Sequence, residues 1–298
     1  MKLLYHESNN VGDFINEIVF DEIRTLPAPD SHMALGIGTI LGLKTPLEST
    51  TYHVFGSGLS SDQIDTYGTF DSSKIHQYVF HGVRGPLTAN AIDSNSPPKI
   101  SGDFAYLLTK KIQPTRTEST QNIGFVPHKD SLQFYGFWEQ LLQSVNIKLI
   151  SPLLPPQEFI DGLSGCSRVM CEAMHGAILC DAYGIPWLPV FTYPGISHSK
   201  WNDWLGSMGH QNVNFLYLRG PRDNKWKQHI LSHFLGNSIA EIVAARYEKL
   251  MAQVFLKKLL SISAKSNFLL SDRAMVSRTI SLQQDIIRSF LAAFSAAQ

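Results

Sequence analysis

The sequence predicts an α/β protein with two lobes, each built around a mainly parallel sheet. Its 298 residues exceed the roughly 100–200 residues of an average domain, which favours more than one folding unit. Short apolar runs, small-residue turns and amphipathic stretches recur in the same order, as expected of βα units. Between the two sets of units, "TKKIQPTRTESTQN" (109–122) has no apolar periodicity and indicates a linker.

Four strands are expected in the first lobe, at 2–6, 32–38, 51–58 and 76–83. A helix over 12–23 is predicted by apolar residues that recur on one side, namely Phe14, Ile15, Ile18, Val19 and Ile23. Asp13 can cap the first turn of this helix. Pro86 suits the first turn of a second helix within 84–92.

The second lobe repeats the alternation, with strands expected at 123–128, 147–152, 167–172 and 185–190. The helices between them are expected at 130–145, 156–166 and 175–184. From about Trp226 the sequence becomes helical, and 237–263 is its most strongly periodic segment. The predicted units are therefore an N-terminal lobe (1–112), a C-terminal lobe (120–220) and a helical extension (221–298).

The charge distribution argues against nucleic acid as a partner. The formal net charge is zero, although residues 215–298 hold 12 Lys or Arg against 5 Asp or Glu. No basic cluster is interleaved with aromatic residues, as a strand-binding groove requires. We expect the apolar face of the basic extension to pack on the lobes. Peripheral contact of Lys257 and Lys258 with an anionic inner membrane leaflet is the open alternative.

The chain start has no signal-peptide core, and no run approaches the roughly 18 apolar residues of a membrane span, so a cytoplasmic location is expected. Cys166, Cys171 and Cys180 match no zinc spacing and are interpreted as reduced packing residues. No carboxylate cluster has metal-ligand spacing. The glycine turns at 36–42 and 56–61 match neither the dinucleotide nor the Walker pattern, so packing is their expected role. We expect neither a metal nor a resident cofactor.

Polar residues follow the predicted strands where each strand ends. Arg84 follows 79–83, Asp103 follows a short run ending at Ile100, and His128 ends its strand. Glu172 and His175 follow a further strand, three residues apart. Singly, such residues are commonly helix caps, surface ion pairs or structural histidines. Together at the carboxyl ends of strands they predict a cleft for a small anion that undergoes acid–base chemistry.

The motifs, taken in order, resemble the polysaccharide pyruvyl transferase family over roughly residues 1–210. They are "NNVGDFIN" (9–16), "ALGIGTIL" (34–41), "VFGSGL" (54–59), "HGVRGPLTA" (81–89), "SGDFAYLL" (101–108), "GFVPH" (124–128), "EAMHGAILCDAYGIP" (172–186) and "KWNDWLGSM" (200–208). The resemblance implies two Rossmann-like lobes of the glycosyltransferase-B kind with the active site between them. It also implies transfer of pyruvate from phosphoenolpyruvate, as co-substrate, to two sugar hydroxyls, giving a cyclic ketal on an exopolysaccharide or cell-wall precursor.

The site residues carried by these motifs fall into three groups. The catalytic candidates are His175, Glu172 and Asp103. The donor-binding candidates are Arg84, Gly85, His128, Arg168 and Gly176. The acceptor-binding candidates are Asn10, Asp13, Lys200, Trp201, Asp203 and Trp204, although "HSKWNDWLGSM" can equally form a helix that covers the second lobe.

Within these groups His175 is expected to shuttle protons, because an imidazole titrates near neutral pH, or to bind phosphate as a cation. In the second case Glu172 or Asp103 serves as base. Arg84 is expected to be the main anion ligand. Two departures bear on these roles: Ala173 stands where many relatives have an arginine two residues before the histidine, and Phe104 replaces the proline of a "GDP" motif.

Two other functions remain open on the sequence alone. A nucleotide-sugar glycosyltransferase can use the same two-lobe scaffold, since fold does not fix function. A non-catalytic partner in polysaccharide assembly is favoured by the missing arginine. Attachment of the saccharide acceptor to a polyprenyl diphosphate is also open, and a basic extension suits an acceptor presented at the inner leaflet.

Overall fold

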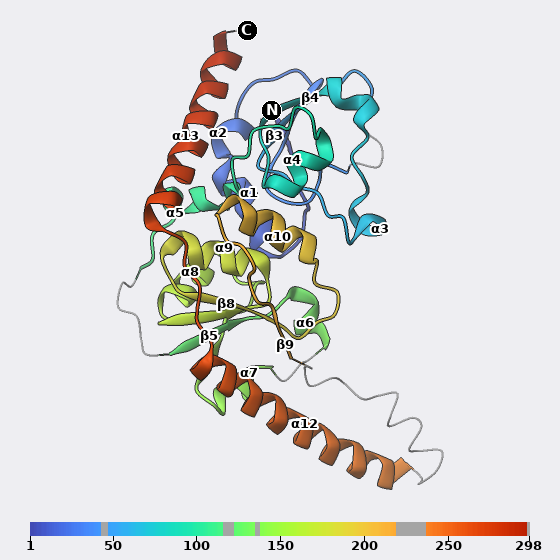
Figure 1. Ribbon diagram of the computed structural model, residues 1–298, viewed down its shortest axis with the longest axis vertical. Coiled ribbons are helices and arrows are strands. Elements are labelled where there is room, and N and C mark those ends of the chain that lie inside the picture. The colour runs from blue at the N-terminus through green and yellow to red at the C-terminus, as the bar shows by residue number, and fades with distance from the viewer. Residues whose placement is uncertain (43–46, 116–121, 135–137, 219–236, 297–298) are drawn as a thin grey trace.

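The computed structural model describes the whole chain except residues 43–46, 116–121, 135–137, 219–236 and 297–298. Two parallel sheets lie one above the other along the long axis, and a helical C-terminal part runs beside both (Figure 1). The predicted α/β class with two lobes is therefore confirmed. The more specific glycosyltransferase-B likeness stays a prediction, and part of the predicted linker lies outside the described residues.

The first sheet has the strand order β1-β2-β3-β4. Its strands are β1 (Lys2–Leu4), β2 (His32–Leu35), β3 (Thr51–Phe55) and β4 (Tyr78–Gly82). The helices of this lobe are α1 (Val11–Val19), α2 (Asp21–Arg24), α3 (Ile64–Tyr67), α4 (Pro86–Ile92) and α5 (Leu108–Lys111), with 3₁₀ helices η1 (Ser72–Gln77) and η2 (Phe104–Leu107). All strand pairs are parallel, so their carboxyl ends meet at one edge.

The helix predicted over 12–23 is interrupted in the structure. Phe20 leaves the helical conformation and separates α1 from α2. Asn10, not Asp13, caps α1, because its side chain accepts a hydrogen bond from the Gly12 amide. Phe14 was predicted to share one side of the helix with Ile15 and Val19, which are buried, yet 44% of Phe14 is exposed. Pro86 occupies the first turn of α4, as predicted.

The second sheet has the order β6-β5-β7-β8-β9, again entirely parallel. Its strands are β5 (Ile123–Val126), β6 (Ile147–Leu149), β7 (Arg168–Cys171), β8 (Trp187–Phe191) and β9 (Leu216–Tyr217). The helices are α6 (Lys129–Phe134), α7 (Trp138–Gln143), α8 (Pro156–Ser164), α9 (Met174–Tyr183) and α10 (His198–Ser207). The strand order reverses between β5 and β7, and ligands of open α/β sheets bind beyond the strand ends at such a point.

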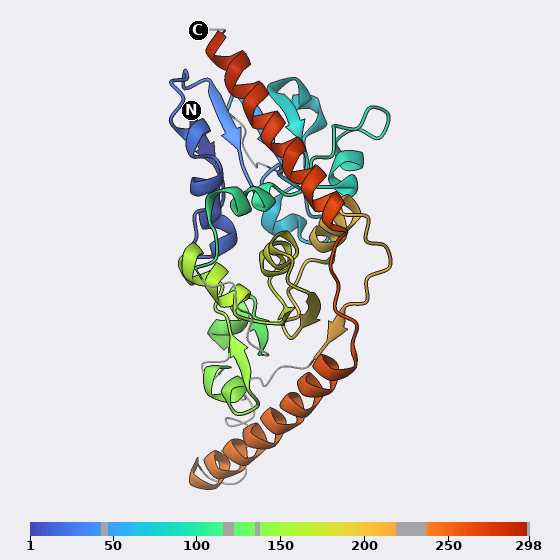
Figure 2. The ribbon, with the colours of Figure 1, turned by 90° about the vertical axis from the view of Figure 1, so that its left-hand side faces the viewer.

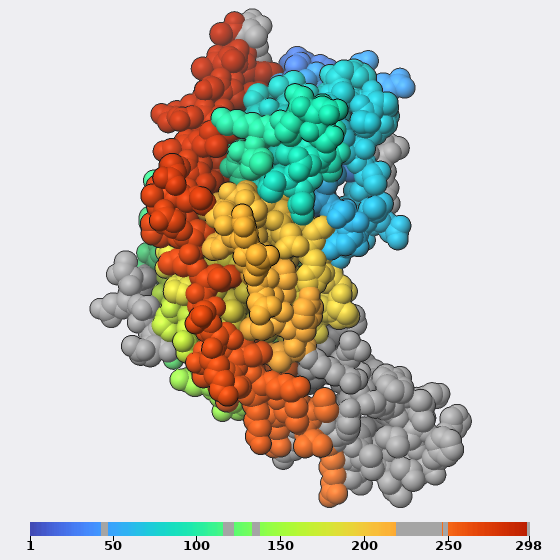
Figure 3. Space-filling model, viewed as in Figure 1, coloured from blue at the N-terminus to red at the C-terminus, as the bar shows by residue number. Residues whose placement is uncertain are grey.

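The C-terminal extension covers both lobes. Helix α12 (Asn237–Lys265) packs Phe255 and Leu259 against Trp138 and its neighbours in the second lobe. Helix α13 (Arg273–Ala296) then runs back along the first lobe, where Phe290 contacts Phe55. Figures 2 and 3 show this path, red at its end, from one lobe to the other. The expected packing of the apolar face is therefore confirmed for α12, whereas the segment around Trp226 lies outside the described residues.

No helix in the described ranges combines the length and apolar character needed to cross a membrane. Lys257 and Lys258 are exposed on α12, but contact with a membrane stays a prediction. Cys166, Cys171 and Cys180 are free and buried, in agreement with the packing role. Burial raises the pKa of the Cys166 thiol to about 11, so this side chain stays a neutral thiol near pH 7.

Candidate active site

A cleft of about 600 Å³ lies at the carboxyl ends of the strands of both sheets. The loops after β1, β2, β5, β7 and β8 form its walls, together with the start of α10. Eight of the fourteen predicted site residues line it: Asn10, Asp13, His128, Glu172, His175, Gly176, Lys200 and Trp201. Of the five polar residues that were expected to converge on one cleft after separate strands, His128, Glu172 and His175 line it, whereas Arg84 and Asp103 do not.

His175 lines the cleft and faces Asp103, which is buried and does not line it. His175 is the second residue of α9, and its Nε2 lies 3.7 Å from Oδ2 of the fully buried Asp103. Neither of these two atoms has a hydrogen-bond partner among the described residues. The other carboxylate oxygen of Asp103 accepts a hydrogen bond of 2.9 Å from the Ala105 amide at the start of η2. A small approach would complete an imidazole–carboxylate hydrogen bond.

The histidine ring is held on its other side by α1. A Cβ atom on Gly12 would lie only 2.0 Å from Nδ1 of His175, so the ring packs directly on the glycine backbone. Asp103 comes from the first lobe, Gly12 from the first helix and His175 from the second lobe. The imidazole is therefore positioned by elements that only the folded molecule brings together.

Glu172 has a different role from the predicted one. Its carboxylate accepts hydrogen bonds from the His128 amide (2.9 Å), from the Thr192 amide and hydroxyl (2.6 and 2.8 Å) and from the Tyr193 amide (2.7 Å). The residue is fully buried. Because all these donors belong to the loops after β5 and β8, Glu172 fixes two walls of the cleft. The interpretation of Glu172 as a base beside His175 does not fit this geometry.

The start of α9 supplies an anion-binding element. Ala173 is its N-cap and provides no side-chain hydrogen bond, so the first-turn amides keep free N–H groups with a positive helix-dipole end. Gly176 allows this helix end to approach β5 closely, since a Cβ there would lie 2.8 Å from the Val126 side chain. Such helix ends bind phosphate and carboxylate groups.

Lys200 projects into the cleft from α10. Its Nζ lies 3.3 Å from the centre of the Tyr67 ring, a cation–π contact. Burial, and secondly the positive charge of Arg84, lower the pKa of Lys200 to about 7, against opposing effects of Asp62 and Asp13. Near neutral pH this amine therefore exists in both protonation states. It was predicted on the acceptor side, and in the structure it lines the same cleft as the start of α9.

His128 stacks on Tyr193, with ring centres 5.6 Å apart and an angle of 7° between the planes. Burial lowers the pKa of His128, although Asp130 and Glu172 act in the opposite direction. The stacked pair forms a flat wall of the cleft. Lys129, the next residue in the chain, also lines the cleft and was not predicted. Its position directly after a strand end is the sequence signal that could have indicated it.

Arg84 does not line the cleft, in contrast to its predicted role as main anion ligand. The side chain is fully buried and all three of its nitrogen atoms have protein partners. Nε donates to Asp203 at 2.9 Å, Nη1 to the Thr39 hydroxyl and Nη2 to the Leu59 carbonyl oxygen. Arg84 therefore joins the first lobe to α10 and influences the cleft through its charge near Lys200.

Four further residues that were predicted for the site do not line the cleft and instead contact other parts of the protein. Asp203 pairs with Arg84 and also accepts from the Thr88 amide at the start of α4. A Cβ on Gly85 would lie 1.9 Å from the Asp203 carbonyl oxygen, so that glycine permits contact between α4 and α10. Trp204 is buried beside Tyr106. Arg168 begins β7, away from the carboxyl end, and stacks over the Phe268 ring.

Beside the cleft, hydrogen bonds between the two lobes form a network that was not predicted from the sequence. Asp62 of the first lobe accepts hydrogen bonds from Ser197 (2.6 Å) and from the Ser199 amide (3.0 Å) at the start of α10. Burial raises the pKa of Asp62, but these bonds and one from Ser60 outweigh it and hold the pKa below its usual range. The Asp62 carboxylate is therefore ionised, and its hydrogen bonds join the two lobes.

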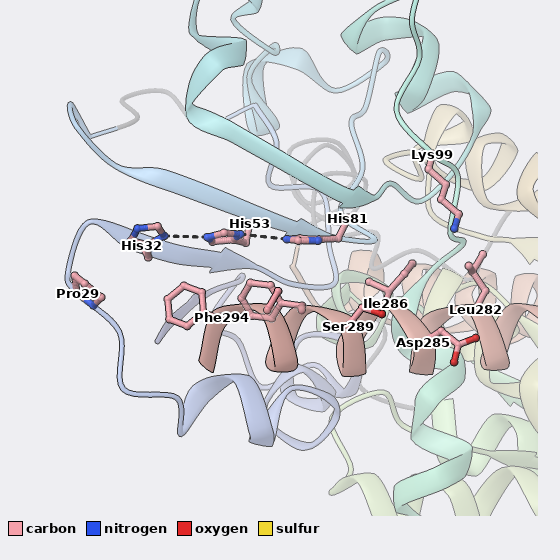
Figure 4. A pocket seen from close by; sticks show the side chains of 12 residues that line it. Pro29, His32, His53, His81, Lys99, Leu282, Asp285, Ile286, Ser289 and Phe294 are labelled. Carbon is pink, nitrogen blue, oxygen red and sulfur yellow. Dashed lines mark hydrogen bonds between the residues drawn. The ribbon is translucent and has the colours of Figure 1, made fainter. Parts of the chain in front are cut away.

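A second cavity, of about 610 Å³, lies between the first sheet and α13. Figure 4 shows His32, His53 and His81 in a row along its sheet side, with ring nitrogens 3.0 and 3.1 Å apart, and the Phe294 ring beside them. Lys99 and Asp285 lie at the other end. These imidazoles form a line and do not converge on one point. In the parts of the chain that the structure describes, no group of three or more His, Cys, Asp or Glu side chains could hold a metal ion.

Comparison with known proteins identifies a family that matches the central part of the chain. Residues 32–194, which include β2 to β8 and the Asp103–His175 pair, match the model of the family described as polysaccharide pyruvyl transferase. Over 217 residues the chain is 31% identical to the succinoglycan biosynthesis protein ExoV of Rhizobium meliloti (strain 1021). That alignment covers 70% of this chain and 65% of the relative, just under two thirds of its length. Since the family model covers more than half of its residues, the chain belongs to the polysaccharide pyruvyl transferase family.

Proposed function

We propose that this chain transfers the pyruvyl group of phosphoenolpyruvate to two hydroxyls of a saccharide, forming a cyclic ketal on an exopolysaccharide or cell-wall precursor. Family membership supports the reaction class, and the relative's name supports a role in exopolysaccharide synthesis. The observation that carries the proposal is one cleft that is lined by His175, which is backed by the buried Asp103 carboxylate and lies in an uncapped helix start, and by Lys200.

Phosphoenolpyruvate brings a phosphate and a carboxylate, and each needs fixed donors. The amides of residues 174–176 and the Lys200 ammonium face the same space. Lys129 adds a second positive charge to the wall. Charge-assisted hydrogen bonds of this kind are roughly twice as strong as neutral ones. We assign donor binding to this side of the cleft, in place of Arg84.

The reaction needs one proton on the methylene carbon and the loss of two hydroxyl protons. The first hydroxyl attacks the central carbon as the methylene carbon is protonated, which gives a tetrahedral phosphate ester. The second hydroxyl then displaces phosphate, and its proton leaves with the phosphate. His175, with the Asp103 carboxylate behind its Nε2, is the group we assign to move the first proton. Removing such a group lowers the rate by about 10²- to 10⁴-fold.

The acceptor sugar is assigned to the wall formed by the His128–Tyr193 pair. Trp201 borders the cleft, but it is only 2% exposed and packs against Trp187 and Phe191, so it supports this wall from within. Flat rings offer a surface on which a sugar ring can pack. Asn10 and Asp13 lie on the same cleft and can accept or donate hydrogen bonds to hydroxyls. Linkage of the acceptor to a polyprenyl diphosphate, a cytoplasmic location and peripheral membrane contact belong to this proposal as well. We also propose that the two lobes are of the glycosyltransferase-B kind, as the resemblance implies.

Isothermal titration with phosphoenolpyruvate tests the donor assignment. We expect saturable binding to the wild type, at least tenfold weaker binding to Lys200→Met, and unchanged binding to the control Lys257→Met, which removes an exposed lysine on α12. Uridine diphosphate glucose serves as the rival ligand. Binding of the nucleotide sugar without binding of phosphoenolpyruvate would establish the glycosyltransferase alternative.

Turnover is measured as phosphate released from phosphoenolpyruvate with methyl glucoside and methyl galactoside as acceptors, and the ketal is identified by mass spectrometry. His175→Ala is expected to retain donor binding and to lose turnover. Wild-type turnover in a folded His175→Ala variant would remove His175 from the mechanism. An absence of donor binding in the wild type would favour the non-catalytic assembly partner.

A further inference from the structure

Helix α13 does not line the cleft, but it contacts the segment that follows Asp103. Its approach begins in the second lobe, where Leu269 and Trp187 exchange backbone hydrogen bonds of 2.7 and 2.9 Å. The Ser271 amide donates to the buried Asp181 carboxylate at 2.8 Å. From there α13 crosses to the first lobe and packs against η2, the 3₁₀ helix that follows Asp103 (Figure 2). The helix is thus fixed at its start by one lobe and lies against the other.

One polar residue interrupts the buried face of α13. The side chains that this helix buries are Val276, Gln283, Ile287 and Phe290. Gln283 is fully buried. Its Nε2 donates hydrogen bonds of 2.9 Å to the carbonyl oxygens of Ser101 and Asp103. A helix that only covered apolar surface would need no amide here, because burying a polar group is unfavourable unless it is hydrogen-bonded. The Nε2 group of Gln283 is satisfied, whereas its Oε1 atom has no partner among the described residues.

The two carbonyl oxygens belong to the segment that presents Asp103 to His175. Gly102 between them has φ +76°, a conformation that favours glycine and bends the chain. Apart from Gln283, this segment is held by the Ser101 amide, which donates to the Val83 carbonyl oxygen at 3.0 Å, and by the Ala105 amide, which donates to the Asp103 carboxylate. Two hydrogen bonds to one planar amide fix the carbonyls on both sides of Gly102, so the Asp103 carboxylate keeps its place beside Nε2 of His175.

We propose that Gln283 is a positioning residue of the active site, which holds Asp103 by its backbone and through it orients the His175 imidazole. This inference rests on the proposed acid–base role of His175. Gln283 lies 180 residues from Asp103 in the chain and outside the region matched by the family model. The C-terminal extension is thereby part of the catalytic apparatus, although none of its residues lines the cleft among those the structure describes.

The variant Gln283→Met, which keeps the side-chain length and removes both donors, is the test. Misplacement of a reacting group by about 1 Å can cost on the order of 10²-fold in rate, so we expect kcat to fall by about 10- to 100-fold. The KM for phosphoenolpyruvate should change by less than about threefold, because the donor ligands come from α9 and α10. Gln284→Leu, at the next and only partly buried position, is the matched control and should leave both constants unchanged.

A measurement on the protein without substrate tests this inference independently of the proposed function. Ring ¹⁵N chemical shifts of His175 report which nitrogen carries the proton. We expect a single tautomer, protonated at Nε2, in the wild type and a mixture in Gln283→Met. Gln283→Asn, which retracts the amide by one methylene, should give an intermediate result and replaces Gln283→Met if that variant does not fold.

The outcomes are distinct. A folded Gln283 variant with the wild-type tautomer overturns the inference, whatever the donor proves to be. A changed tautomer with the wild-type rate contradicts the acid–base role of His175 and with it the positioning role. A loss of kcat that Val276→Ala reproduces, together with an unchanged tautomer, would reduce Gln283 to a packing residue.

Discussion

Lys200 carries a charge whose presence depends on pH near neutrality. Burial and the neighbouring Arg84 both disfavour its protonated form, and the pKa is lowered to about 7. An anion bound next to the amine stabilises the protonated form and raises this pKa again. If the donor binds there as proposed, the lysine links donor binding to proton uptake, which an exposed lysine with its usual pKa near 10.4 would not do.

This linkage gives the first prediction. Phosphoenolpyruvate should bind more weakly as the pH rises from about 7 to 8.5, because a growing fraction of Lys200 must first be protonated. At pH 8 binding should take up protons, which titration calorimetry detects as a heat that depends on the ionisation enthalpy of the buffer. Lys200→Met should lose this uptake, while Lys257→Met retains it. Equal uptake in Lys200→Met and wild type would show that another group is responsible.

Gly12 gives a second prediction at the scale of one residue. An alanine Cβ would lie 2.0 Å from His175 Nδ1, so Gly12→Ala must displace the imidazole. We expect a loss of turnover of about 10²-fold, the cost of misplacing a reacting group by about 1 Å, with α1 intact because alanine favours helices. The control is Gly165→Ala, where the nearest atom to the new Cβ is 3.3 Å away. Turnover of Gly12→Ala within threefold of wild type would contradict the close packing.

The positions of the strands and helices along the chain were predicted well. The contacts between elements that are far apart in the chain were not predicted. The strand ends after β5 and β7 located His128 and His175 correctly, because parallel strands end at the same edge. The row of His32, His53 and His81 was missed, since these residues become neighbours only through the pairing of β2 with β3 and β3 with β4. Periodicity within a segment does not contain that information.

We expect this row to make the docking of α13 sensitive to acid. Burial, with smaller effects of His81 and His32, lowers the pKa of His53 to about 4, and burial lowers the pKa of His81 to about 4. The folded protein therefore keeps both rings neutral, whereas an exposed histidine binds a proton below about pH 6.5. The contribution of these two neutral histidines to the free energy of unfolding is fully present above about pH 6.5 and is lost as the pH falls toward 4. Lys99 and Asp285 line the same cavity and contribute opposite charges.

The variant His53→Gln tests this dependence, because an amide can still bond to both neighbouring rings and does not titrate. Between pH 6.5 and 4.5 the melting temperature of the wild type should fall more steeply than that of His53→Gln. His76→Gln removes an exposed histidine and should keep the wild-type slope. Parallel slopes in wild type and His53→Gln would show that this histidine does not control the acid response.

For the molecule as a whole, the sequence predicted two parallel-sheet lobes and eight of the residues that line the cleft. It misassigned Arg84, Asp203 and Trp204, because polar and aromatic residues in a motif can serve the site or the packing around it. Arg84 and Asp203 are 119 residues apart, and only the folded chain shows that each is the other's partner. An arginine that fits an anion and one that fits a carboxylate of its own chain have the same sequence signature.

The Arg84–Asp203 pair connects the lobes, and its removal should change how the protein unfolds. Both side chains are almost completely inaccessible, so Asp203→Ala leaves a buried guanidinium without its counterion. Breaking such a pair from one side costs about 3–5 kcal/mol, measured as the free energy of unfolding in urea. Asn202→Ala, an exposed position on the same helix, should cost less than about 1 kcal/mol.

Asp203 also holds the start of α4 through the Thr88 amide and hydroxyl, at 2.9 and 2.6 Å. Asp203→Ala therefore removes contacts between α10 and the first lobe as well as the ion pair. We expect fluorescence of the tryptophans, all of which follow residue 137, and circular dichroism of the whole chain to report one shared transition in the wild type. In Asp203→Ala they should separate, because the second lobe loses its coupling to the first. Coincident transitions in a destabilised Asp203→Ala variant would show that α13 alone suffices to couple the lobes.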